Sequence, residues 1–368
     1  MARAVITGYG VVSPYGIGTD AMINGIINNT NCFINQNVYV RDNSEPVVLP
    51  TGRVPLTGEE SAIIPDKYSR IMPPMSLFAY LAYEEARNRA FLTDADMVNA
   101  GIYIASTMSH VHNSSKQLAS DIFKTFNNNP AFLLAEIIGC NNRIVAPCAA
   151  CATGLQAVNL AVEAIEAGKL DIAICGATEE WSNDLAKIFI KLGIASKTEC
   201  RPFAEDRDGT VISEGAGIII LESEEHAKKR LVRHYGYVYG TGYSFSENPH
   251  VPTVESITRC MINSFSSFYI NEPKWMSTEI DIYAHATGTV IGDAVEAEAI
   301  EQFKKRTGII VNRKYLKNHL GHTMAASGVI ELIYSLYHVQ PLPTIHNAFG
   351  LGGVNASTFI VPKAYIGD

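Results

Sequence analysis

The stretch Pro147-Cys-Ala-Ala-Cys-Ala-Thr-Gly154 decides the interpretation of this chain, because a strand-like segment enters it and a helical segment leaves it. Residues 142–146 are predicted to form the strand. Apolar residues then repeat at helical spacing: Leu155, Val158, Val162 and Ile165. Cys151 is therefore predicted at a helix N-terminus, where free backbone N–H groups and the helix dipole lower the pKa of a thiol. The stretch predicts a nucleophilic cysteine.

Two other interpretations of this stretch remain open. Free cysteine is among the most buried residue types, so Cys151 can be a simple packing residue. Cys148 and Cys151 also form a Cys-x-x-Cys pair, which is typical of redox proteins. The surroundings of a thioredoxin-like pair are missing, so the redox interpretation is the weaker of the two.

Short apolar segments alternate with helical ones on both sides of this stretch. Strands are predicted at residues 4–7, 101–105, 142–146, 171–175 and 217–221, and again at 280–284 and 357–361. Helices are predicted at about 294–303 and 325–338 in the second series. Nearly continuous apolar strands are typical of a sheet covered by helices on both faces, and their alternation with helices indicates an α/β protein. The two series meet near residue 230, which predicts two halves, residues 1–232 and 233–368.

Composition excludes several classes of protein. The chain has 368 residues, of which 47% are hydrophobic and 18% charged, so it can bury a large core. Its net charge of -8 argues against sequence-independent nucleic-acid binding, which needs many Lys and Arg contacts to phosphates. The apolar runs are too short to span a membrane, and no signal peptide is recognised at the start. Seven dispersed cysteines predict a reducing cytoplasm without disulfides.

Two histidines follow apparent strands in turns rich in Gly and Thr. His285 begins His285-Ala-Thr-Gly-Thr-Val-Ile-Gly-Asp293, and His322 lies in Lys317-Asn-His-Leu-Gly-His-Thr-Met-Ala-Ala-Ser-Gly328. Two imidazoles facing a thiolate suit acyl transfer, in which Cys carries the acyl group and the histidines stabilise an enolate oxygen. His319 and His322 lack further ligands at metal-binding spacing, so no metal is expected.

Five segments together resemble the β-ketoacyl-acyl carrier protein synthases, the condensing enzymes of fatty acid and type II polyketide synthesis. The segments are 5–14, 149–154, 201–209 with 214–217, the two histidine turns, and Phe349-Gly-Leu-Gly-Gly-Val-Asn355. The resemblance covers most of the chain. It implies a thiolase-like fold, with two similar βαβ-type halves in a layered α-β-α-β-α arrangement.

The resemblance also separates the chain from relatives of that family. Thiolases use a second cysteine near the C-terminus, and no cysteine follows Cys260 here. Synthases that start chains from acyl-CoA have Asn where this chain has His322. Chain-length-factor subunits usually replace the nucleophile, whereas Cys151 is present. The chain therefore looks like the elongating Cys-His-His type, which implies decarboxylative Claisen condensation on malonyl-acyl carrier protein, in fatty acid or polyketide and polyene synthesis.

Residue roles follow from the resemblance alone. Cys151 would accept the acyl chain, and its backbone N–H with that of Phe349 would form the oxyanion hole. His285 and His322 would stabilise the enolate. Lys317 would position this pair of histidines, opposite the carboxylate of Glu331.

Substrate and partner contacts are implied in the same way. Thr287 and Thr289 match hydroxyls that bind the pantetheine arm, Phe349 matches the gate over the acyl pocket, and Arg201 matches an arginine that docks the carrier. The family implies an acyl carrier protein as partner, a homodimer or a heterodimer with a second ketosynthase-like chain, and no cofactor. The glycine loop Gly8-Tyr-Gly10 lacks the third glycine of a dinucleotide site.

The chain departs from the family pattern at several positions. Ala286 replaces the usual glycine after the first histidine, Ala204 replaces an aspartate, and Leu351 replaces an aromatic residue in the gate loop. A long segment before Phe349 is missing, and residues 108–146 look contracted. Two alternatives stay open: a subunit of a specialised heterodimer, and a non-catalytic scaffold of the same fold.

Overall fold

The computed structural model describes residues 3–41, 45–69, 71–108, 119–248, 252–271, 278–337 and 341–366. Within them the strands form one mixed 11-stranded sheet and a separate three-stranded sheet. The large sheet consists of two parts with the same pairing pattern, joined in its middle.

The first part of the sheet contains the strands in the order β6-β5-β7-β9-β1. Their bounds are β6 Ile144–Val145, β5 Gly101–Ala105, β7 Ile172–Glu179, β9 Gly215–Ser223 and β1 Ala4–Ser13. Strands β6, β5 and β7 run parallel to one another, whereas β9 is antiparallel to both β7 and β1.

The second part repeats this arrangement in the order β12-β11-β13-β14-β10. Its strands are β12 Ile310–Lys314, β11 Glu279–Tyr283, β13 Thr344–Phe349, β14 Val354–Pro362 and β10 Gly236–Phe245. Again three strands are parallel and the other two pairings are antiparallel. A short antiparallel pairing of β1 with β10 joins the two parts.

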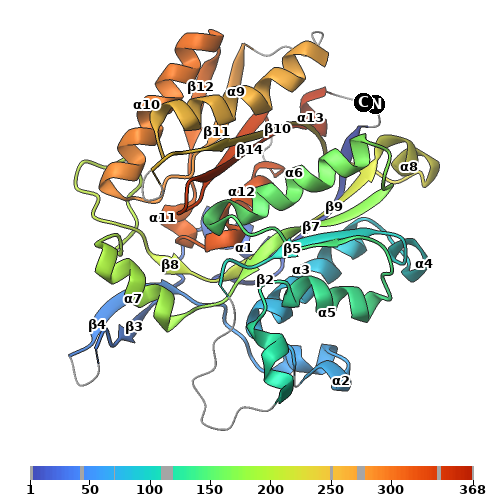
Figure 1. Ribbon diagram of the computed structural model, residues 1–368, viewed down its shortest axis with the longest axis horizontal. Coiled ribbons are helices and arrows are strands. Elements are labelled where there is room, and N and C mark those ends of the chain that lie inside the picture. Colours follow the sequence, from blue (N-terminus) through green and yellow to red (C-terminus); the bar gives the residue numbers. More distant parts are fainter. Residues whose placement is uncertain are drawn as a thin grey trace.

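Helices form three layers around the two parts of the sheet (Figure 1). Helices α6 (Thr153–Glu166) and α12 (Ser327–Ser335) lie in the middle layer, where α6 contacts β7 and β14, and α12 contacts β9 and β13. Helices α3 (Pro74–Arg89) and α5 (Asn129–Ile138) cover the outer face of the first part, and α9 (Val254–Asn271) and α10 (Val290–Thr307) cover the second. The five layers confirm the predicted thiolase-like fold.

The strands of both parts are apolar because helices cover them on both faces. Every residue of β1, β7, β9 and β13 is buried, as the near-continuous apolar runs predict. Helix α10 is longer than predicted. Helix α12 begins at Ser327 and ends at Ser335, so it is shorter than the predicted helix, whose last residue, His338, lies outside the described residues. The division at residue 232 stays a prediction.

The small sheet contains β3 (Phe33–Val38), β4 (Val47–Gly52) and β8 (Ile212–Ser213). The remaining elements are β2 Gly16–Ile17, α1 Thr19–Ile27, η1 Glu59–Ile63, α2 Asp66–Ser69, α4 Asp94–Met97, η2 Ala119–Thr125, η3 Ala150–Ala152, α7 Asn183–Leu192, α8 Glu224–Lys229, α11 Lys317–Leu320, η5 Met324–Ala326 and α13 Lys363–Ile366. Among the helices of the described residues, none has both the length and the apolar character that crossing a membrane requires.

Candidate active site

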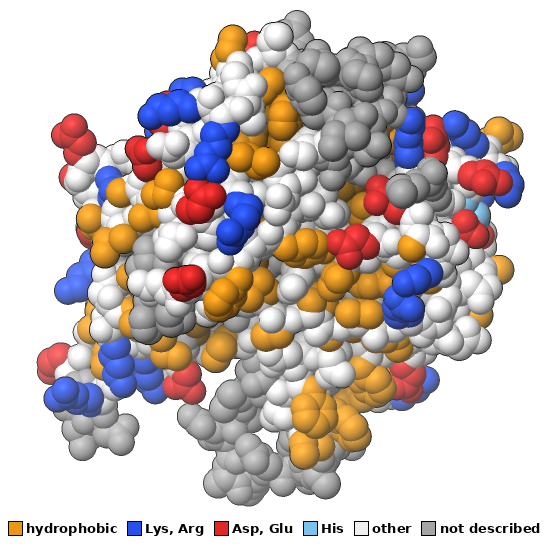
Figure 2. Space-filling model, turned by 45° about the horizontal axis from the view of Figure 1, so that its top comes forward, with side chains coloured by type: hydrophobic (Ala, Val, Ile, Leu, Met, Phe, Trp, Pro, Cys, Tyr) orange, Lys and Arg blue, Asp and Glu red, His pale blue; other side chains and the backbone are white. Residues whose placement is uncertain are grey.

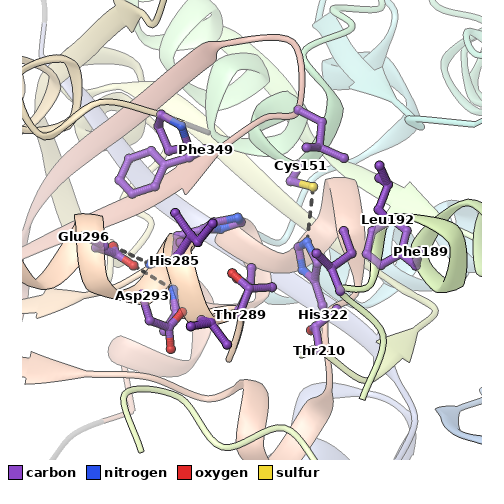
Figure 3. Close-up of a pocket in the computed structure, with 18 of the residues that line it drawn as sticks. Cys151, Phe189, Leu192, Thr210, His285, Thr289, Asp293, Glu296, His322 and Phe349 are labelled. Carbon is purple, nitrogen blue, oxygen red and sulfur yellow. Dashed lines mark hydrogen bonds between the residues drawn. The ribbon is translucent and has the colours of Figure 1, made fainter. Parts of the chain in front are cut away.

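Cys151 lies in η3, the turn between β6 and the N-terminus of α6. Its side chain is buried, with 4% of the residue exposed. The sulfur faces His322, whose Nε2 lies 3.1 Å from Sγ (Figure 3). The structure thus places the predicted nucleophile before the middle-layer helix and pairs it with a histidine from the other half.

Backbone contacts from the small sheet hold His322 in place. Its N–H donates to the carbonyl of Val211 at 2.7 Å, and its own carbonyl accepts the N–H of Ser213 at 3.0 Å. These bonds form a parallel bridge between His322 and β8. The small sheet therefore positions a residue of the second half beside Cys151.

His285 follows β11 and lies across the same cavity, between His322 and Phe349 (Figure 3). The two imidazole rings are perpendicular, with centroids 5.2 Å apart. The ring of Phe349 packs edge-on against His285 from the other side at 5.4 Å. The three residues that the sequence singles out, Cys151, His285 and His322, are therefore brought together.

Two buried acids that the sequence analysis missed hold the turn after His285. Glu296 accepts the backbone N–H groups of His285 at 2.7 Å and Ala286 at 2.8 Å. Asp293 accepts the N–H of Gly288 at 3.0 Å. Both acids lie in α10, three residues apart, and this i, i+3 pair directly after the histidine turn is a signal in the sequence that could have identified them.

Three of the seven described non-glycine residues with positive φ lie beside the catalytic candidates. Ala150, Ala286 and Met324 have φ of 47°, 46° and 48°. Residues other than glycine rarely adopt this left-handed conformation, and where it occurs it clusters at functional sites. Ala150 precedes Cys151 and Ala286 follows His285, so the chain bends sharply where it presents both side chains.

Lys317 and Glu331 form a buried ion pair behind the histidines. Lys317 Nζ donates to Glu331 Oε1 at 2.8 Å, and Lys317 is only 1% exposed. The structure therefore pairs the two residues as the family resemblance implies. Burial raises the pKa of Glu331, and the Lys317 ammonium acts against that rise.

The pKa of the Cys151 thiol differs from the value that the sequence predicts. Burial is the largest effect on Cys151 and raises its pKa to about 12, and Glu179 adds to the rise. Lys317 and backbone N–H groups lower the pKa by less. The predicted lowering of the pKa at the helix N-terminus is wrong for the free protein, because desolvation outweighs the helix-terminal N–H groups.

The two imidazoles are neutral at ordinary pH. Burial and the neighbouring Lys317 ammonium hold the pKa values of His285 and His322 well below their usual range. A neutral imidazole carries one N–H donor and one acceptor nitrogen. Each histidine therefore has one N–H with which to bind an oxygen that gains negative charge.

Glu179 is a further buried acid, and its charge acts on the Cys151 thiol. Its carboxylate accepts the Ser106 hydroxyl at 2.7 Å and the N–H of Met108 at 3.1 Å. Burial raises its pKa to about 7, against these hydrogen bonds. Nothing in the sequence around Glu179 distinguishes it from an ordinary strand-end residue.

The oxyanion hole expected at the backbone N–H groups of Cys151 and Phe349 stays a prediction. Hydrogen bonding by the backbone N–H groups of Cys151 and Leu351 lowers the pKa of the Cys151 thiol, against the larger effect of burial. Phe349 is the last residue of β13 and pairs with Asn355 of β14. Leu351 lies in the turn between these strands, where Gly352 and Gly353 have φ of 101° and 89°.

A cavity of about 360 Å³ leads from the surface to the three catalytic candidates. Thr287 and Thr289 line it, with their hydroxyls 3.0 Å apart. Apolar residues of α7 line the opposite side, among them Phe189 and Leu192 (Figure 3). The cavity thus combines hydroxyl groups along one wall with apolar surface along the other.

Arg201, the predicted carrier-docking residue, is surrounded by acids. Its guanidinium lies 3.4 Å from Glu199, 3.6 Å from Asp206 and 3.7 Å from Asp208. The face seen in Figure 2 likewise has basic and acidic side chains interspersed with apolar ones. The local charge of Arg201 is therefore largely compensated, and its role in docking stays a prediction.

The catalytic candidates also have the donor set of a soft-metal site. One ligand atom from each of Cys151, His285 and His322 lies within 4.8 Å of the others. A thiolate with two imidazoles is a common set for zinc. His319, which the sequence analysis considered beside His322, is not part of this group.

Comparison with known proteins assigns both parts of the chain to one family. The family model described as "Beta-ketoacyl synthase, N-terminal domain" matches residues 1–227, and the one described as "Beta-ketoacyl synthase, C-terminal domain" matches residues 245–347. A 3-oxoacyl-[acyl-carrier-protein] synthase 1 from Buchnera aphidicola is 28% identical, with 98% of the chain and 99% of that protein aligned. A synthase 2 from Rhizobium meliloti is 26% identical over the full length of both.

Solved structures show the same fold. A β-ketoacyl synthase from Burkholderia phymatum superposes with a TM-score of 0.87 at 24% identity, covering 99% of this chain and all of the other. The ishigamide ketosynthase/chain length factor superposes with a TM-score of 0.81 at 22% identity, covering 98% of each chain.

Proposed function

The chain belongs to the β-ketoacyl synthase family, and from this we propose that it is a 3-oxoacyl-acyl carrier protein synthase. It joins an acyl group held on Cys151 to the two-carbon unit of malonyl-acyl carrier protein, which gives 3-oxoacyl-acyl carrier protein and CO2. The observation that carries the proposal is the convergence of Cys151, His285 and His322 within 4.8 Å at the end of one cavity. The pathway is fatty acid or type II polyketide synthesis.

The first step loads the enzyme. The sulfur of Cys151 attacks the acyl thioester of the carrier, the acyl–sulfur bond to the pantetheine breaks, and the thiol proton leaves with the carrier thiol. The backbone N–H groups of Cys151 and Leu351 bind the oxyanion of the tetrahedral intermediate. Such preorganised donors typically supply a rate factor of about 10² to 10³ each.

The second step forms the carbon–carbon bond. The thioester oxygen of the malonyl unit accepts hydrogen bonds from His285 and His322 while CO2 leaves and its bonding electrons form an enolate. The enolate carbon attacks the acyl carbonyl, and the Cys151 thiolate is expelled. Both imidazoles serve as N–H donors here, which fits their lowered pKa values.

Further residues assist both steps without forming or breaking a covalent bond. Burial keeps both imidazoles neutral, and the positive charge of Lys317, which Glu331 holds in place, adds to that effect. The hydroxyls of Thr287 and Thr289 bind the pantetheine arm in the cavity, Phe349 packs on His285 as part of the gate, and Arg201 contacts the carrier. The reaction needs no cofactor, because decarboxylation supplies the driving force.

We also propose that the protein binds a second ketosynthase-like chain, which is either another copy of this chain or a different one. Large apolar residues are exposed near β6, the edge strand of the large sheet in the described part of the chain: Ile122, Phe123, Phe126, Phe132 and Ile144, which are 38% to 56% exposed. An exposed sheet edge flanked by apolar surface favours association. We propose that the partner chain packs here.

Seven unpaired cysteines support a reducing cytoplasm as the location.

A reconstituted assay tests the proposed function. Purified protein is mixed with acyl-carrier and malonyl-carrier thioesters, and mass spectrometry follows the product carrier and the mass added to Cys151. Product from the unaltered chain and from Cys148→Ala, with none from Cys151→Ala, is expected. Turnover only after adding a second ketosynthase-like chain would favour the heterodimer subunit. A Cys151 that no acyl-carrier acylates would favour the scaffold.

A further inference from the structure

The start of α12 places a hydroxyl group directly behind the second catalytic histidine. Ser327 is the first residue of α12, and its Oγ lies 3.2 Å from His322 Nδ1. The other ring nitrogen, Nε2, is the one that faces Cys151 at 3.1 Å. One side of the His322 ring is thus in contact with Ser327 and the other with the nucleophile.

The direction of the hydrogen bond at Ser327 follows from counting protons. The hydroxyl of Thr323 donates to Ser327 Oγ at 3.4 Å. Among the described residues, the only other side-chain group in hydrogen-bond contact with Ser327 Oγ is His322 Nδ1. A serine hydroxyl has one proton, so with Thr323 donating to its oxygen, that proton is directed to Nδ1.

The tautomer of His322 then follows. A ring nitrogen that accepts a hydrogen bond carries no proton, so a ring whose Nδ1 accepts from Ser327 is not an imidazolium. A neutral ring whose Nδ1 accepts a hydrogen bond carries its proton on Nε2. All three groups are buried: His322 and Thr323 are 1% exposed and Ser327 is 3% exposed. Water therefore does not compete for Nδ1.

We propose that Ser327 is a positioning residue that holds His322 in the Nε2–H tautomer and so directs its only N–H toward Cys151 and the substrate oxygen. The proposal rests on the proposed function, in which that N–H stabilises the enolate oxygen. The opposite tautomer would direct a lone pair at the developing negative charge. The hydrogen bonds from Thr323 to Ser327 and from Ser327 to His322 thus determine which ring nitrogen of the imidazole carries the N–H donor.

The same helix supplies a matched control. Ser335, two turns further along α12, also contacts a buried histidine, with its Oγ 3.2 Å from His346 Nε2. His346 lies in β13 and does not line the cavity described above. Ser335→Ala removes a comparable hydroxyl–imidazole contact from the same helix without touching the catalytic site.

The test compares Ser327→Ala, Thr323→Val and Ser335→Ala with the unaltered protein. Ser327→Ala is expected to lower the rate of malonyl-carrier decarboxylation about tenfold to a hundredfold, which is less than the roughly 10²- to 10³-fold loss when an oxyanion donor is removed, because the ring keeps its N–H and loses only the alignment. The KM for the carrier is expected to stay within about twofold, because the pantetheine contacts are elsewhere. Thr323→Val, which leaves the serine free to reverse its hydrogen bond, is expected to have a smaller effect in the same direction. Ser335→Ala is expected to keep the full rate.

Nitrogen NMR of histidine-labelled protein gives a readout that does not depend on turnover. The Nε2 resonance of His322, assigned by its loss in His322→Asn, is expected in the protonated range. In Ser327→Ala it is expected to move toward the average of the two tautomers. An unprotonated Nε2 in the unaltered protein, or an unchanged resonance and rate in Ser327→Ala, would overturn the proposal. If the protein condenses no substrate at all, the proposed function fails, but the resonance still decides the tautomer.

Discussion

His322 Nε2 lies 3.1 Å from Cys151 Sγ, although the two residues are 171 positions apart in the chain. The contact joins the two halves, because Cys151 precedes α6 in the first half and His322 precedes α12 in the second. Helices α6 and α12 pack side by side between the two parts of the sheet (Figure 1). The duplicated fold therefore brings the catalytic candidates together at the junction of its two parts.

The reactivity of Cys151 is expected to rise steadily with pH. Its pKa of about 12 lies above the usual value, so only a small thiolate fraction exists at neutral pH. Alkylation by iodoacetamide, quantified at Cys151 by mass spectrometry, should increase about tenfold for each pH unit between 7 and 9, since the thiolate is the nucleophile. A plateau of the rate at or below pH 8 would mean that a thiolate–imidazolium pair exists instead.

Removing the charge of Lys317 is expected to destabilise the protein strongly. Lys317→Met leaves Glu331 buried without its partner, and breaking a buried ion pair typically costs about 3–5 kcal/mol. The free energy of unfolding in urea is the measurement. The double variant Lys317→Met with Glu331→Leu should recover most of the stability, since an apolar replacement of both partners is often neutral.

The double variant separates stability from catalysis. Without the Lys317 ammonium, the pKa values of His285 and His322 should rise toward their usual range, because Lys317 lowers both. The condensation rate should then fall on the acid side at a higher pH than in the unaltered protein. A stable double variant with an unchanged pH profile would show that Lys317 has no role at the histidines.

Ala286→Gly is expected to stabilise the fold by about 1 kcal/mol. Ala286 has a φ of 46°, a conformation that costs an L-residue roughly 1–2 kcal/mol and costs glycine nothing. The gain from replacing Ala286 with glycine is partly offset, because glycine loses more conformational entropy on folding. Chemical denaturation measures the change. Ala284→Gly, two residues earlier at a buried position without positive φ, serves as the control and should destabilise instead. An equal loss of stability in both variants would contradict the strain argument.

Zinc is expected to inhibit the enzyme by binding the catalytic residues. Micromolar Zn²⁺ should block acylation, because a thiolate and two imidazoles within 4.8 Å match its preferred ligands. Binding measured by calorimetry should release a proton from the thiol, disappear in Cys151→Ala and persist in Cys148→Ala. A chelator should restore activity. Binding of equal strength in Cys151→Ala would place the metal elsewhere.

The sequence predicted several of the strands and helices of this protein and the residues that we propose carry its chemistry. Apolar runs such as 217–221 predicted strands buried on both faces, because a strand covered by helices has no exposed face. The turns at Cys151, His285 and His322 identified the catalytic candidates. These turns are rich in small residues, which leave room for a reactive side chain close to the backbone.

Only the tertiary structure decided the electrostatics and the supporting contacts. The pKa of Cys151 depends on its burial and on Glu179, which no local pattern around the cysteine reports. The backbone N–H of Leu351, in the turn between β13 and β14, lowers the pKa of the Cys151 thiol although the two residues are far apart in the sequence. Local periodicity specifies helices and strands, whereas pKa values and hydrogen-bond partners come from groups far away in the chain that folding brings within a few ångströms.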